Sequence, residues 1–246
     1  LYPLSIIELS KLDCFKEKSM LEILEIYMLI GGFPRAISDF VTLGSIRDAT
    51  YETYRNWIIG DAQRYELRQE TLKQILFRIA QTIASRVTWP VLIENSPVRS
   101  HETALQYVEH LQDAFLCVIH YCYDNKTKGP AFQKARKLFF IDPLIYTISA
   151  TWKEGIPNIF DWMKQKLKES DFKGKLLESV VVNHVSRKHD NVYFWYSTKQ
   201  KREIDILISH QNQLMFYEVK LQPSQSYKIM GNEVKILHPE EFLKFI

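Results

Sequence analysis

The sequence predicts an α/β multidomain protein with three parts: a helical segment at residues 1–66, a winged-helix domain at 67–170 and a small α/β domain at 171–246. Three observations predict this division. Helix caps and breakers fill the first part, three helical stretches followed by two apolar strands fill the second, and a hairpin of alternating residues dominates the third. With 46% hydrophobic and 25% charged residues, the chain has an ordinary globular composition.

The first part contains strong helix boundaries. Ser19 is suited to cap a helix that ends at Gly31-Gly32, and Pro34 is suited to open the next one. A longer helix is predicted from about Ser45 to Trp57. Residues 1–66 are therefore expected to be helical.

The second part has the element order of a winged helix. Helices are predicted at Thr71–Ser85, Pro90–Glu94 and Ser100–Gln112, and strands at Phe115–Tyr123 and Lys137–Ile141. The third helix, in the position that reads DNA, carries Glu102, Glu109 and Asp113, which would repel phosphates.

The loop between the two strands has the opposite character. Its basic residues have no acid among them; they are Lys126, Lys128, Lys134, Arg136 and Lys137. Such a run is suited to follow a phosphate backbone, and it is equally typical of a solvated hairpin tip. We therefore predict sequence-independent affinity for DNA through this wing.

Candidate catalytic residues lie on the hairpin formed by residues 203–208 and 214–220. If its turn is centred between Gln211 and Asn212, paired residue numbers sum to 423, and Asp205 faces Glu218. Alternation places Lys220 on the same face. Opposed carboxylates are suited to hold Mg²⁺ or Mn²⁺, with the ammonium acting on a water or a phosphate.

Two further observations bear on this cluster. A helix predicted at residues 173–189 carries Glu178 at the edge of its apolar stripe, so Glu178 is expected to point towards the hairpin. The alternative interpretation is an ordinary cross-strand ion pair between Lys220 and Glu203, because these numbers also sum to 423.

Glu178, Asp205 and Glu218-Val219-Lys220 resemble the motif of the PD-(D/E)xK, or restriction-endonuclease-like, superfamily. The resemblance implies a restriction-endonuclease-like α/β fold for 171–246, metal ligation by Glu178, Asp205 and Glu218, and a role for Lys220 beside the attacking water. One departure is the short stretch between Lys220 and the strand predicted at Val234–Leu237, where the superfamily has a fuller helix. A terminal helix is expected from Pro239.

A longer series of motifs resembles the C-terminal region of archaeal and bacterial AAA+ type ATPases. These motifs are Leu1-Tyr2-Pro3-Leu4-Ser5 with Glu8, Gly31-Gly32-Phe33-Pro34, Lys137 to Asp142, Gly174 to Glu178, Phe194-Trp195-Tyr196 and the hairpin. The resemblance implies an upstream ATPase domain that binds ATP. No phosphate-binding loop of the Gly-x-x-x-x-Gly-Lys-Ser/Thr type occurs here, so no nucleotide site is expected in this chain.

Composition excludes several other classes. The three cysteines form neither a disulfide framework nor a Cys-x-x-Cys zinc pair, and the net charge of +3 permits DNA as a partner without requiring it. No apolar run is long enough for a membrane span and no export signal is apparent, so a cytoplasmic location is expected.

The leading functional hypothesis is metal-dependent cleavage of DNA phosphodiesters, coupled to the ATPase domain. The alternatives are a non-catalytic DNA-binding or regulatory portion of that ATPase, and a module that docks subunits of a homo-oligomer.

Overall fold

The computed structural model describes the chain except residues 1, 95–97, 99, 200, 212 and 230. Its N-terminal part is helical, as predicted: α1 (Ile6–Ser10), a short 3₁₀ turn, α2 (Met20–Ile30), α3 (Pro34–Leu43) and α4 (Asp48–Arg64). Ser19 and Glu22 form a reciprocal capping box at the start of α2, and α3 begins at Pro34. Helix α4 continues beyond the expected end at Trp57 because the first left-handed residue after it is Glu66, with φ 58°.

The middle of the chain has the predicted order of elements. Helices α5 (Gln69–Gln81), α6 (Trp89–Ile93) and α7 (His101–Asp113) precede the antiparallel strands β1 (Cys117–Tyr121) and β4 (Arg136–Phe140). Between these strands lies a second small ladder, β2 (Tyr123–Asp124) with β3 (Gly129–Pro130). Ser100 caps α7, since its side chain accepts a hydrogen bond from the Thr103 N–H.

Asp142 joins the N-terminal helices to α8 (Pro143–Trp152). Its carboxylate accepts hydrogen bonds from the backbone N–H of Leu144, at 2.8 Å, and of Gly32, at 2.7 Å. A Cβ on Gly31 would lie 1.9 Å from Asp142 Oδ1, so only glycine fits there. Burial raises the pKa of Asp142 to about 6.

The C-terminal part is a curled sheet of five strands in the order β5-β6-β7-β9-β8. Helices α9 (Ile159–Lys166) and α10 (Ser170–Ser186) connect the helical part to this sheet. The sheet strands are β5 (Val192–Ser197), β6 (Arg202–His210), β7 (Gln213–Val219), β8 (Tyr227–Ile229) and β9 (Asn232–Leu237), followed by α11 (Pro239–Phe245). Strands β7 and β9 are parallel, and the crossover between them contains the strand β8 in place of the fuller helix of the superfamily.

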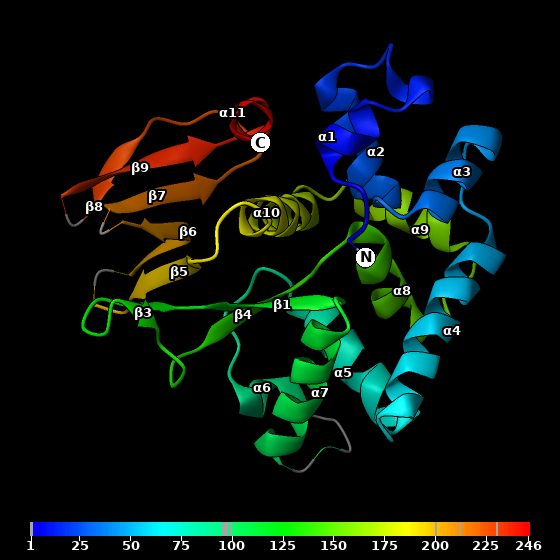
Figure 1. Cartoon of the computed structure of the whole chain (residues 1–246), viewed down its shortest axis with the longest axis horizontal. Helices are drawn as coiled ribbons and strands as arrows, with labels where there is room; N and C mark the ends of the chain where they lie inside the picture. Colours follow the sequence, from blue (N-terminus) through cyan, green and yellow to red (C-terminus); the bar gives the residue numbers. More distant parts are fainter. Residues whose placement is uncertain (1, 95–97, 99, 200, 212, 230) are drawn as a thin grey trace.

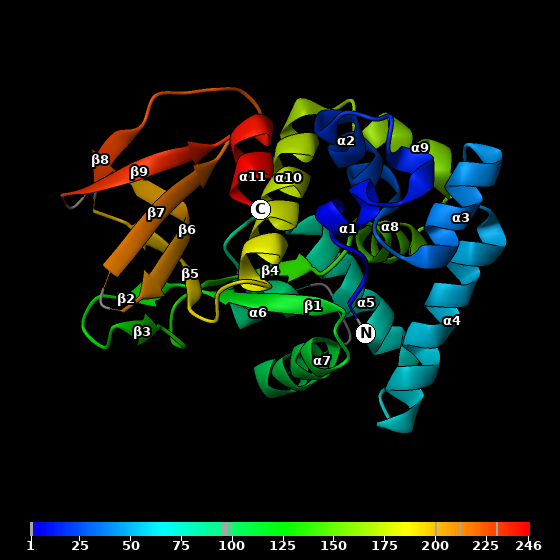
Figure 2. The same cartoon turned by 45° about the horizontal axis from the view of Figure 1, so that its top comes forward.

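Helix α10 lies between this sheet and the helical half, and the β1–β4 hairpin runs along the edge of the sheet that ends in β5 (Figures 1 and 2). One hydrophobic core runs from α1 and α2 through α8 and α10 to Ile206, Ile208 and Tyr217 of the sheet. A smaller cluster, which includes Tyr123, Trp195, Ile204, Leu207 and Phe216, covers the other face. Among the described residues, no helix combines the length and apolar character that a membrane crossing requires.

Candidate functional site

The register of the β6–β7 hairpin is the predicted one. Ile206 pairs with Tyr217, and the pairing continues to His210 with Gln213, so each pair sums to 423. The turn residue Asn212 lies outside the described residues. The ladder stops before Asp205, whose carboxylate Oδ2 instead accepts a hydrogen bond from the Val219 N–H at 3.0 Å.

A bulge on β6 explains why the ladder stops there. On the side of β5, Leu207 pairs with Tyr193 and Ile204 pairs with Trp195, which leaves Asp205 and Ile206 together opposite one residue of β5. An extra residue of this kind changes the face to which a side chain points. Asp205 therefore points towards α10 and β4.

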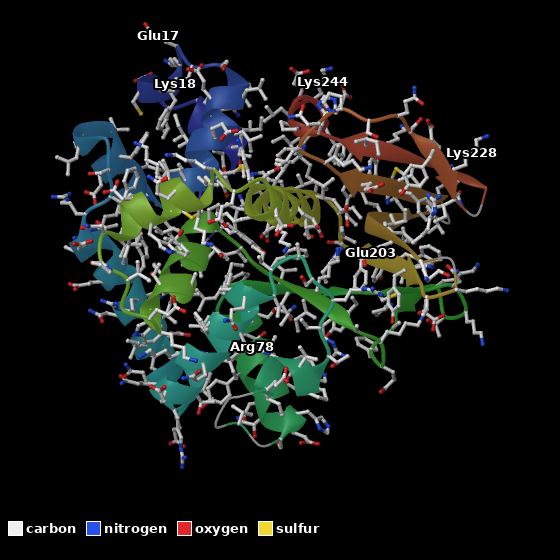
Figure 3. All side chains as sticks on the ribbon, turned by 180° about the vertical axis from the view of Figure 1, so that it is seen from behind. Glu17, Lys18, Arg78, Glu203, Lys228 and Lys244 are labelled. Carbon is white, nitrogen blue, oxygen red and sulfur yellow. The ribbon has the colours of Figure 1, made fainter. Side chains whose placement is uncertain are left out.

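There the carboxylates surround the ammonium group of Lys137 on β4. Its Nζ lies 2.7 Å from Glu178 Oε1, 2.5 Å from Glu203 Oε1 and 3.2 Å from Asp205 Oδ1. The side chain of Lys137 is only 1% exposed, whereas those of Glu178 and Asp205 are 13% and 15% exposed. We call these four residues the lysine-centred cluster. Figure 3 shows Glu203 at the boundary between the C-terminal sheet and the middle of the chain.

The electrostatics of the cluster follow from its charges. Burial opposes the charge of Lys137, yet the surrounding carboxylates raise its pKa well above the ordinary value. Burial and the neighbouring Asp205 carboxylate raise the pKa of Glu178 to about 8. Arg86 adds a second positive charge, 3.0 Å from Glu203. Three carboxylates thus face two cations, and the carboxyl group of Glu178 retains a proton near neutral pH.

Glu218 and Lys220 lie apart from this cluster. Lys220 pairs with Glu218 at 3.4 Å, and alternation along β7 puts Glu218 with Phe216, on the face away from α10. Burial and a hydrogen bond with Glu218 raise the pKa of Tyr227. The structure thus brings Glu178 and Asp205 together without Glu218 and Lys220. Glu203 pairs with Lys137 and Arg86 instead of Lys220.

The arrangement fits an ammonium group better than a divalent cation. Within the described ranges, no three His, Cys, Asp or Glu residues are placed to hold a metal ion. Glu178, Glu203 and Asp205 offer the oxygen ligands that Mg²⁺ prefers, but each already contacts Lys137. A metal would have to displace that ammonium.

The basic wing divides into two groups. Lys126, Lys128 and Lys134 are exposed, in keeping with a surface that could meet phosphates. Arg136 and Lys137 are 4% and 1% exposed, so we remove them from the outer basic surface expected from the sequence. Their apolar neighbours draw both side chains into the interior, where Lys137 finds carboxylates.

Sequence reasoning missed Lys137, Glu203, Arg86 and His120 as members of the site. His120 Nε2 lies 3.0 Å from the Asp205 carbonyl oxygen, and burial lowers the pKa of His120 to about 3, so its ring is neutral. The available signal was the position of Lys137, directly before the apolar run Leu138-Phe139-Phe140-Ile141. A lysine in a buried strand requires carboxylate partners.

The fold and site define a mixed α/β protein whose helical and sheet parts meet at a lysine-centred cluster. The chain belongs to a family defined by a domain of unknown function, DUF8612, whose model matches residues 21–153, more than half of the chain. A second domain of unknown function, DUF4143, matches residues 173–239. No curated protein and no solved structure matched the chain. Lys137 lies in the first matched region and its three carboxylates lie in the second, so the cluster joins the two.

Proposed function

We propose that this chain is a non-catalytic regulatory portion of an AAA+ type ATPase, in which a winged-helix unit and a restriction-endonuclease-like unit are fixed together by the lysine-centred cluster. The observation that carries the proposal is the fully buried Lys137 ammonium with three carboxylates within 3.2 Å. A buried charge that is paired in this way is costly to disturb. The cluster therefore acts as a joint between the two units.

The endonuclease-like assignment is supported by the element order. Helix α10 supplies Glu178, the β6–β7 hairpin supplies Asp205, and a parallel strand, β9, follows. The ATPase assignment is supported by the ordered motifs from Glu8 to Lys220. In such a protein, ATP would bind to the other domain, and this unit would transmit or restrain its movements.

The test is an incubation of the purified chain with supercoiled plasmid DNA and millimolar Mg²⁺ or Mn²⁺, with the melting temperature measured in parallel. We expect neither cleavage nor a metal-dependent rise in melting temperature, because the Lys137 ammonium already lies between the carboxylates that would hold the metal. Cleavage that requires the metal and disappears in Asp205→Asn would overturn the proposal.

A second candidate is metal-dependent cleavage of DNA phosphodiesters. It is favoured by the approach of Glu178 and Asp205, from a helix and a strand, to a single cation. In this case Mg²⁺ or Mn²⁺ would be held by Glu178, Asp205 and Glu203, while Lys220 would remain beside Glu218 at the end of β7. If this candidate is correct, Lys137→Ala should strengthen metal binding. If the cluster instead joins the two units, the same change should destabilise the fold.

DNA and a second copy of the chain are the partners that suit either candidate. The exposed lysines of the wing, Lys126, Lys128 and Lys134, are suited to contact phosphates without reading bases. The chain is also suited to dock on a second copy of itself, and a measurement of its molar mass in solution tests this.

A further inference from the structure

A cavity of about 480 Å³ lies between α6, α7 and the β1–β4 hairpin, and no residue of the lysine-centred cluster is among those that line it. Trp89, Tyr121 and Phe132 give it aromatic walls, and its lining also includes one cation, Arg136, and one carboxylate, Glu109 of α7. Phe132 is 61% exposed, although its ring packs edgewise on Tyr121 with the centroids 5.0 Å apart. A large apolar side chain held in this way at the opening of a cavity is suited to contact a ligand.

Arg136, on the same cavity, is a buried cation with no carboxylate partner among the residues that the structure describes. It is 4% exposed, and its guanidinium lies 4.2 Å from the ring centroid of Trp89. Its Nη2 donates to the carbonyl oxygens of Phe132 and Lys134, at 3.3 and 2.7 Å. Within the described part of the chain, its Nε–H has no acceptor and no carboxylate pairs with it.

A buried guanidinium that carries its charge without an anion is unfavourable, because desolvation is not offset. The cost is relieved if the anion comes from a ligand. Arg136 is suited to this role because its planar group binds phosphate or carboxylate through paired donors and stacks on aromatic rings at the same time.

The exposed charge on the hairpin that carries Arg136 favours a polyanion. Lys134 is two residues from Arg136, and Lys126 and Lys128 lie further along the same hairpin loop, all three exposed. A small aromatic acid would use the cavity alone and leave these lysines without a role. A chain of phosphates that carries a planar ring on each unit would use both features.

We propose that this cavity binds one nucleotide unit of a single-stranded nucleic acid, with the base against Tyr121 and Phe132, the phosphate at Arg136, and neighbouring phosphates along Lys134, Lys128 and Lys126. A duplex keeps its bases stacked and paired, so it cannot place a base in the cavity without first unpairing it. The site is independent of the lysine-centred cluster, and its binding requires no catalysis.

The test is fluorescence anisotropy with a labelled thymidine oligonucleotide and, for comparison, a duplex of the same length at the same salt concentration. The wild-type chain should bind the single strand more tightly than the duplex. Phe132→Ala should weaken single-strand binding roughly tenfold, because one base loses its stacking surface. The matched control is Phe115→Ala: Phe115 is also exposed, at 47%, but it packs on Tyr2 and does not line this cavity.

Arg136→Met should also weaken binding and should reduce the steepness of its dependence on salt concentration, because one phosphate contact is lost. If this variant does not fold, the two phenylalanine variants decide the question alone, since both changes are at the surface. Equal affinity of Phe132→Ala and Phe115→Ala would refute the proposal. Equal affinity of the wild-type chain for single strand and duplex, or no binding at low salt, would also refute it.

Discussion

Replacing Lys137 by Met removes the charge at the centre of the lysine-centred cluster and keeps a side chain of similar length. Glu178, Glu203 and Asp205 then face one another without the ammonium that lies within 3.2 Å of each. Removing one partner of a buried ion pair typically costs about 3–5 kcal/mol. In a chain of this size, each kcal/mol lowers the melting temperature by roughly 2–4 °C. We therefore expect a fall of roughly 6–20 °C.

Urea unfolding followed by circular dichroism measures this loss. The control is Lys166→Met, which removes a 3.0 Å ion pair between Lys166 and Glu169. The side chains of these two residues are 36% and 58% exposed. That exposed pair should contribute less than about 1 kcal/mol. Adding Asp205→Asn to Lys137→Met should restore part of the stability, because a carboxylate that has lost its ammonium partner becomes neutral.

The reasoning fails if Lys137→Met costs no more than Lys166→Met. It also fails if Asp205→Asn further destabilises the Lys137→Met variant. Either result would mean that the carboxylates tolerate one another, through water or a bound cation, and that Lys137 does not hold the two matched regions together.

Three further predictions concern other groups. The pKa of Glu178 is raised, so the folded state holds a proton that the unfolded state has lost. The free energy of unfolding should therefore fall as pH rises from 6.5 to 8, by at most about 1.4 kcal/mol per pH unit. Urea unfolding of Glu178→Gln should lack this pH dependence. Gly31→Ala places a Cβ 1.9 Å from Asp142 Oδ1 and should cost about 3 kcal/mol or more, whereas Gly44→Ala, at φ 70° with nothing within 4 Å, should cost about 1 kcal/mol in the same assay. If the two alanine variants lost the same free energy of unfolding, the close approach of Asp142 to Gly31 would be contradicted. Replacing the exposed wing lysines Lys126, Lys128 and Lys134 by Ala should lower the affinity for unrelated DNA sequences by the same factor and should make the affinity depend less steeply on salt concentration, as measured by anisotropy titration. A change in sequence preference would contradict the assignment of these lysines to phosphate contacts.

Local signals in the sequence determined much of the secondary structure. Ser19 with Glu22, Pro34 and Asp142-Pro143 mark helix starts because their side chains or fixed φ satisfy the first turn by themselves. The 423 register of the β6–β7 hairpin followed from period-two alternation and the position of its turn. These features depend on residues close together in the chain, so reading the sequence in order is sufficient to find them.

Only the tertiary structure decided which charged groups meet. The bulge at Asp205 depends on pairing with β5 as well as β7, and it turns Asp205 away from Glu218 and towards Glu178. The sequence places Lys137 in the basic wing because Lys134 and Arg136 precede it, yet every residue of its strand is buried. Its charge is stable only because carboxylates from α10 and β6, at least 41 residues away in the chain, lie within hydrogen-bonding distance. A pattern along the chain contains no information about that distance, since burial and Coulomb attraction act between residues that folding alone brings together.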